Sequence, residues 1–112
     1  MTPETFEKIW LDQVQIEKSM LLERAEAYAT GGDRLGNFKC GAALIGGHPL
    51  KYGFSLVVKH IMAMRDLIDK IDGGNGKFDD YEAAKFAEYV TDIRNYAVLF
   101  KGIYEESREA RK

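Results

Sequence analysis

The sequence contains few of the residues that small proteins use to staple a fold or cross a membrane. Among its 112 residues is one cysteine, Cys40, so no disulfide can form within the chain. Charged residues interrupt every apolar run well before the roughly 20 apolar residues that a membrane helix needs. The first residues lack the apolar segment of an export signal. We therefore expect a cytosolic protein that does not contact a membrane.

The chain also lacks a large excess of positive or negative charge. The 16 Lys and Arg residues are interspersed with 18 Asp and Glu residues, and the net charge is −2. Because phosphate backbones are bound by a basic excess, this balance argues against nucleic acid as a partner. One cysteine and two histidines are too few for a typical zinc site, and neither histidine has an evident nucleophile partner. The remaining candidates are carboxylates, amides and a few cations.

The periodicity of apolar residues predicts helices throughout, in one domain spanning residues 1–112. Thr2 and Pro3, and later His48 and Pro49, are typical helix starts, and Asp79 or Asp80 can cap the last helix. Short glycine-containing loops join the segments, so we predict an all-α antiparallel bundle of three long helices and one short helix. The expected helices are Pro3 to about Thr30, Phe38–Ile45, Pro49–Asp72 and Tyr81–Arg108, with 104–112 as a solvated helix end.

Each long helix carries an apolar stripe that we assign to the core. The stripes are Phe6, Trp10, Met20, Leu21 and Tyr28 on the first helix; Leu50, Phe54, Val57, Ile61, Met64 and Ile68 on the third; and Phe86, Val90, Ile93, Ala97 and Phe100 on the last. Further apolar residues lie on the other sides of the last two helices. Because this exceeds what one small core needs, we predict a homodimer that buries the surplus face.

Asp92 is the best single pointer to a functional site. It lies on the side of the last helix opposite the core stripe, together with Glu88 and Asn95, yet Tyr89 and Tyr96 flank it. A carboxylate in such surroundings is costly unless it is paired, hydrogen-bonded or bound to a metal. The alternative is a partly exposed acid at the edge of a wide core face.

Two other polar residues lie on apolar surfaces. Glu17 projects from the centre of the first helix's stripe, where it forms either a surface pair with Arg24 or a second carboxylate facing the last helix. His60 lies on an apolar flank of the third helix, as a core histidine with a satisfied ring or as a ligand or phosphate contact.

The loop before the short helix also has two interpretations. Asp33 or Asn37 can cap that helix. Arg34, together with free backbone amides at the helix start, can instead form an anion cradle.

Three spaced segments, Asp33-Arg-Leu-Gly-Asn37-Phe38, Lys59-His60 and Asp92-Ile-Arg-Asn95-Tyr96, resemble a group of small phage-encoded proteins related to the MazG-like nucleotide pyrophosphohydrolases and the nucleotide-modification-associated domains. The resemblance covers roughly Ala25 to Tyr104. It implies a helical bundle, usually oligomeric, in the host cytoplasm. Such a bundle holds Mg²⁺ on carboxylates of adjacent helices and cuts a nucleoside triphosphate between its α and β phosphates.

By position, the resemblance matches Asp92 and Glu88 to the acids of the last-helix motif, and Asn95 and Tyr96 to the residues that close it. From the helix faces themselves, we add Asp66 and Glu17 as candidate Mg²⁺ ligands. The further candidate ligand or phosphate contacts are Arg34, Asn37, Lys59 and His60. Catalytic members carry a Glu-x-x-Glu pair on the third helix, where this chain has Lys59-His60 and a single Asp66. The departure favours a protein that binds a nucleotide or a nucleotide-derived signal. Two alternatives remain open: a Mg²⁺-dependent nucleoside triphosphate pyrophosphohydrolase, and a ligand-free helical protein whose surplus apolar face docks a partner.

Overall fold

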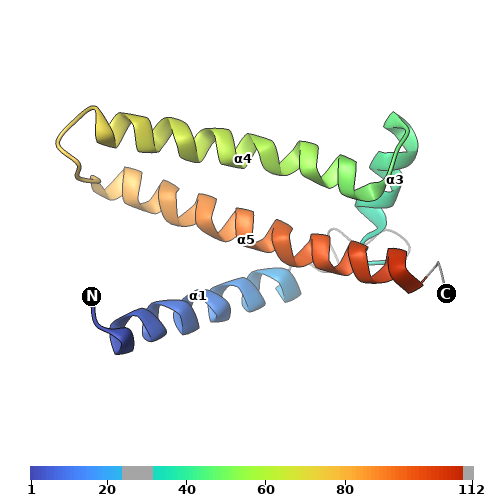
Figure 1. Cartoon of the computed structure of the whole chain (residues 1–112), viewed down its shortest axis with the longest axis horizontal. Coiled ribbons are helices and arrows are strands. Elements are labelled where there is room, and N and C mark those ends of the chain that lie inside the picture. Colours follow the sequence, from blue (N-terminus) through green and yellow to red (C-terminus); the bar gives the residue numbers. More distant parts are fainter. Residues whose placement is uncertain (24–31, 110–112) are drawn as a thin grey trace.

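The chain is all-α in the computed structural model, which describes residues 1–23 and 32–109 (Figure 1). No strand occurs in those two ranges, and none of their helices is long and apolar enough to span a bilayer. Predictions that concern residues 24–31, including Arg24 and Tyr28, lie outside the described residues. The helices are α1 (Pro3–Glu23), α3 (Gly36–Ile45), α4 (Pro49–Asp72) and α5 (Asp80–Glu109).

Local side chains start α1 and α4 as the sequence predicts. The Thr2 hydroxyl accepts the backbone N–H of Thr5 at 3.1 Å. His48 Nδ1 accepts the N–H of Leu50 at 3.0 Å, and Pro49 occupies the first position of α4. Each contact satisfies a backbone donor that the helix itself leaves unpaired. These two helix starts are therefore encoded locally.

The start of α5 is closed by a reciprocal pair of hydrogen bonds. Asp79 Oδ1 accepts the N–H of Glu82 at 2.7 Å, and Glu82 Oε1 accepts the N–H of Asp79 at 3.0 Å. This capping box confirms Asp79 as the cap. The second oxygen of Glu82 lies 3.0 Å from Lys70 Nζ, which ties the end of α4 to the start of α5.

The short helix α3 begins two residues earlier than predicted, at Gly36. Asp33 Oδ1 accepts the N–H of Leu35 at 3.0 Å, so this side chain closes the turn before the helix and does not cap the helix. Leu35 is the residue at the N-cap position, and its side chain makes no capping hydrogen bond. Asn37 already lies inside the first turn.

The helices α4 and α5 form the central antiparallel pair (Figure 1). The short helix α3 packs on α4 near its start, and α1 packs on α5, which lies between α4 and α1 in the view of Figure 1. The contact of α1 with α5 includes Gln13, whose Nε2 donates to Thr91 Oγ1 at 2.9 Å. All ten residues before Leu11 are exposed, so the first turns of α1 extend away from α5.

The core is small and lies where α3, α4 and α5 meet. Its buried hydrophobic residues in the described part of the chain are Phe38, Ala42, Val57 and Ile103. Gly53 permits the close approach there, because a Cβ atom at this position would lie 2.6 Å from Phe100 Cε1.

The predicted core stripes are only partly correct. Phe54, Ile61 and Ile68 of α4 are 61%, 44% and 45% exposed, whereas Val57 is buried. The side of α4 that faces α5 carries Gly53, Val57 and His60, which is the flank rather than the centre of the predicted stripe.

The same correction applies to α1 and α5. Phe6 and Trp10 are 63% and 51% exposed, because α5 covers this face of α1 only farther along the helix. On α5, Thr91 and Asn95 are buried, and Asn95 lies on the side opposite the predicted core stripe. That side is where α1 and α4 approach α5 from two directions.

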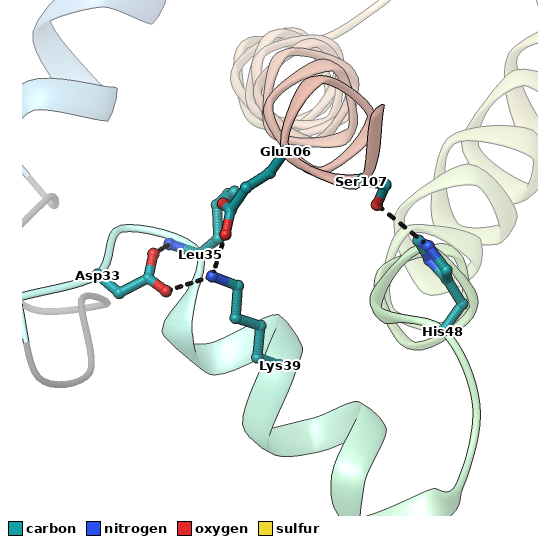
Figure 2. Close-up of polar contacts among 6 residues, drawn as sticks. All are labelled: Asp33, Leu35, Lys39, His48, Glu106 and Ser107. Carbon is teal, nitrogen blue, oxygen red and sulfur yellow. Dashed lines mark hydrogen bonds and ion pairs between the residues drawn. The ribbon is translucent and has the colours of Figure 1, made fainter. Parts of the chain in front are cut away.

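Two contacts tie the end of α5 to other helices, while most side chains of residues 104–109 are exposed. Lys39 of α3 pairs with Glu106 of α5 and, at 2.5 Å, with Asp33 (Figure 2). Ser107 Oγ lies 3.2 Å from His48 Nε2 (Figure 2). The last described turns of α5 therefore hold the starts of both α3 and α4.

Candidate ligand-binding cavity

A cavity of about 500 Å³ lies between α1, α3, α4 and α5. Most of its wall is apolar and aromatic, and its polar groups come from the loop before α3 and from the facing sides of α4 and α5. The apolar wall comprises Met20, Leu21, Phe38, Cys40, Gly41, Leu44, Tyr52, Leu56 and Leu99; the polar wall comprises Arg34, Asn37, His60, Asp92, Asn95 and Tyr96.

His60 and Asp92 join α4 to α5 at the polar wall. His60 Nδ1 lies 3.3 Å from Asp92 Oδ2, and the two side chains are 29% and 17% exposed. The ring of Tyr96 lies beside the imidazole, with 5.5 Å between ring centroids. Asp92 is therefore a paired carboxylate in largely apolar surroundings, and His60 is a histidine with a partner that still reaches the cavity.

Asn95 supplies the most unusual polar group. It is 8% exposed, and its Oδ1 atom accepts no hydrogen bond from the described residues. Buried polar atoms nearly always have a partner, because an unpaired one has lost its water without compensation. The amide lies one helical turn from Asp92, so it belongs to the same wall.

The apolar wall is shaped by one close contact between α3 and α4. A Cβ atom on Gly41 would lie 2.2 Å from Tyr52 Cε1, so the ring lies flat against the glycine. A larger residue would force Tyr52 to move. Gly41 thus fixes where this part of the cavity wall stands.

The structure brings together five of the six residues predicted to contact a ligand. Lys59 is the exception: it is exposed and does not line the cavity. Consecutive residues in a helix point about 100° apart, so when His60 faces α5, Lys59 faces outward. The predicted basic pair therefore does not act together. The five residues on the cavity wall are Arg34, Asn37, His60, Asn95 and Tyr96.

The four carboxylates predicted as metal ligands lie apart, and only Asp92 of these four lines the cavity. Asp66 is exposed, 3.5 Å from Arg65 Nη2, and Glu88 lies 3.6 Å from Lys85 Nζ. Within residues 1–23 and 32–109, no three His, Cys, Asp or Glu side chains are grouped as a metal site requires. These donors do not fit a Mg²⁺ ion held by several carboxylates.

Glu17, the fourth carboxylate, has a structural partner that the sequence did not reveal. It is 6% exposed and accepts hydrogen bonds from Arg94 Nε and, at 3.4 Å, from Arg94 Nη2. It does face the last helix, as one interpretation expected, but it meets a guanidinium there. The pair clamps α1 onto α5 next to the cavity.

No family model, curated protein or solved structure matches the chain. The resemblance to MazG-like proteins thus remains a prediction based on three sequence segments. What the structure establishes is the all-α fold and the convergence of those segments on one cavity.

Sequence reasoning placed His60 on an apolar flank of the third helix but did not recognise that this flank forms the wall of a cavity. Tyr52 and Leu56 precede His60 by eight and four residues, which is the spacing of one helix face, and Gly41 and Gly53 mark close helix contacts. That spacing could have identified the flank of α4 that faces α5. The contributions of Met20 and Leu21 depend on how α1 lies on α5, and no local pattern encodes this.

Proposed function

We propose that the chain binds a nucleotide or a nucleotide-derived small molecule in this cavity. The volume of about 500 Å³ falls within the roughly 300–1,000 Å³ of small-molecule sites. Such sites combine a mainly apolar wall with a few converging polar groups. The cavity has this composition. Its polar groups come from α5, from the facing side of α4 and from the segment around the start of α3.

The unpartnered amide oxygen of Asn95 carries the proposal. Leaving a buried acceptor without a donor costs about 1–3 kcal/mol. A ligand N–H group would recover this cost once the side chain turns toward the cavity, because the oxygen itself is buried. A carboxamide presents an acceptor and donors side by side, and this pattern matches a base edge that carries an amino group next to a ring nitrogen, as in adenine. Asn95 is accordingly assigned to the base.

The aromatic wall supports the same assignment. Tyr52 and Tyr96 both line the cavity. A planar base stacks on such rings, and each base stacked on an aromatic side chain contributes about 1–3 kcal/mol. The aliphatic residues Leu56 and Leu99 extend this surface.

The charged groups are assigned to sugar and phosphate. The Arg34 guanidinium can bind a phosphate through two parallel N–H groups, and a ring N–H of His60 can donate a further hydrogen bond. Asp92, a carboxylate on the same wall, can accept a hydrogen bond from a ribose hydroxyl.

The proposal concerns binding and needs no metal. Because the described donors do not group around one ion, phosphate contact is assigned to cations, and affinity should persist in a chelator. Whether a bound nucleotide is hydrolysed is a separate question, which product analysis with and without Mg²⁺ answers.

Calorimetry with nucleoside mono-, di- and triphosphates of the common bases, in EDTA, tests the proposal. We expect saturable binding of at least one of them and a loss of roughly 1.5–3 kcal/mol in His60→Ala, which is about tenfold to a hundredfold in Kd. Lys59→Ala is the matched control, because this cation is adjacent in sequence and outside the cavity. Absence of binding across the panel, or equal losses in both variants, would refute the proposal.

A further inference from the structure

The protein exposes far more surface than a compact chain of its size. Its accessible surface is 8134 Å², whereas the usual scaling with mass gives roughly 6,200 Å² for a 12.7 kDa monomer. The radius of gyration is 16.7 Å, against roughly 13 Å for a compact domain of this length. The excess of roughly 1,900 Å² exceeds the roughly 800 Å² that each partner contributes to a standard stable interface.

Part of this excess is an apolar stripe on the outer side of α4. The stripe consists of Phe54, Ile61 and Ile68, which are 61%, 44% and 45% exposed. They are spaced by seven residues, almost two helical turns, so they lie in one line about 21 Å long. In Figure 1, α4 is an outer helix, with α5 between α4 and α1.

The stripe is separate from the ligand-binding cavity. Leu56 and His60 line the cavity, and both lie to one side of buried Val57 around the helix, whereas Phe54 and Ile61 lie to the other side. A molecule bound on the stripe would leave the polar wall of the cavity uncovered.

We propose that a second copy of this chain covers the stripe, with the two α4 helices antiparallel. The stripe is symmetric about Ile61, which lies seven residues from both Phe54 and Ile68. A two-fold axis through Ile61 therefore packs this residue on its own copy and packs Phe54 on Ile68 of the second copy. One patch thus serves both sides of an isologous contact.

The charges beside the stripe select this direction. Lys51 lies ten residues before Ile61, whereas Asp69 and Asp72 lie eight and eleven residues after it, and all three are exposed. An antiparallel pair brings Lys51 of each copy between the two acids of the other. A parallel pair would place like charges together and align the two helix dipoles unfavourably.

Cross-linking tests this geometry in the full chain, with Cys40→Ser as the background. A cysteine from Ile61→Cys meets its own copy at the two-fold axis, so mild oxidation should give a disulfide-linked dimer in high yield. The control Lys59→Cys lies on the outward side of the same helix but off the stripe, and it should give at least tenfold less linked product. Equal linking at both positions, or none at position 61, would overturn the proposal.

Sedimentation velocity provides the second test. The unmodified chain should sediment as twice 12.7 kDa at micromolar concentration, and Ile61→Glu should weaken self-association at least tenfold while circular dichroism stays unchanged. Lys51→Glu should weaken association, and adding Asp69→Lys and Asp72→Lys should restore it. A monomeric unmodified chain, or a dimer that Trp10→Glu disrupts and Ile61→Glu does not, would contradict the α4 contact. Because the cavity is separate, nucleotide affinity should be the same in Ile61→Glu.

Discussion

His60 Nδ1 lies 3.3 Å from Asp92 Oδ2, and this pair joins α4 to α5 at the wall of the cavity. The contact gives Asp92, a carboxylate that is 17% exposed among aromatic and aliphatic side chains, a polar neighbour on the facing helix. It also places both residues next to Asn95, whose amide oxygen has no partner among the described residues. The His60–Asp92 pair and the proposed ligand contacts thus lie on the same faces of α4 and α5.

The clamp between Glu17 and Arg94 should contribute strongly to stability. Arg94→Ala leaves a carboxylate that is 6% exposed without its partner, so we expect a loss of about 2–3 kcal/mol in the free energy of unfolding. Urea denaturation followed by circular dichroism measures this. Arg65→Ala is the control, because Arg65 and Asp66 are both largely exposed and such pairs contribute at most about 1 kcal/mol. Equal losses in the two variants would contradict the account.

The capping carboxylate Glu82 should make stability depend on acid pH. The backbone N–H of Asp79 and then the Lys70 ammonium hold the pKa of Glu82 below its usual value. Its contribution is therefore fully present above the ordinary pKa of glutamate and is lost as the pH falls through the lowered, folded-state pKa. The melting temperature should fall less on acidification in Glu82→Gln than in the unmodified chain. Glu88→Gln, an exposed acid on the same helix, should keep the full pH dependence.

Lys39 should hold α3 to the end of α5 without determining global stability. The Asp33 carboxylate and then that of Glu106 raise the pKa of Lys39, so the lysine remains charged through neutral pH (Figure 2). In Lys39→Ala, amide hydrogen exchange should accelerate in the first turn of α3 and the last described turn of α5, while the α4–α5 centre stays protected. Uniform acceleration along the whole chain would show that the contact acts globally.

Substitution by alanine should change the free energy of unfolding in opposite directions at two helical glycines. At Gly53 a new Cβ would lie 2.6 Å from Phe100 Cε1, so overpacking should cost about 1–3 kcal/mol. At Gly102 the nearest atom is Leu35 Cδ2 at 3.6 Å, an ordinary contact, so the higher helix propensity of alanine should give a gain of about 0.5–1 kcal/mol. Chemical denaturation of both variants measures the difference, and a gain at Gly53 would contradict the close packing described here.

Helix boundaries were largely predictable because they depend on neighbouring residues. Thr2 with Pro3, His48 with Pro49, and Asp79 act within one turn, and the structure confirms each as a helix start. The start of α3 was placed two residues late, because Asp33 closes the preceding turn and leaves the cap position to Leu35.

The faces of the helices were less predictable. Phe54 and Ile61 are more apolar than Gly53 and His60, yet α4 turns the second pair toward α5. Hydrophobicity shows what can be buried, whereas the available neighbours decide what is buried. Four described helices cannot cover both sides of α4, so one apolar side remains exposed in the single chain.

The candidate site was predicted as a set of residue types, and the structure adds which of them meet. His60, Asp92 and Asn95 converge, whereas Lys59 points outward and Asp66 and Glu88 pair with nearby cations. A shift of one residue along a helix turns a side chain by about 100°, so Lys59 faces outward where His60 lines the cavity.

Nuclear magnetic resonance with ¹⁵N-labelled chain in EDTA tests the central claim most directly. Adenosine mono-, di- and triphosphate are titrated in turn, and the side-chain amide of Asn95 and the imidazole of His60 are followed. The account predicts saturable shifts of both signals and of the backbone amide of Gly41. It predicts no comparable shift for residues away from the cavity, and no comparable shift in a His60→Ala chain. Shifts confined to residues outside the cavity, or none at millimolar concentration of all three nucleotides, would contradict it.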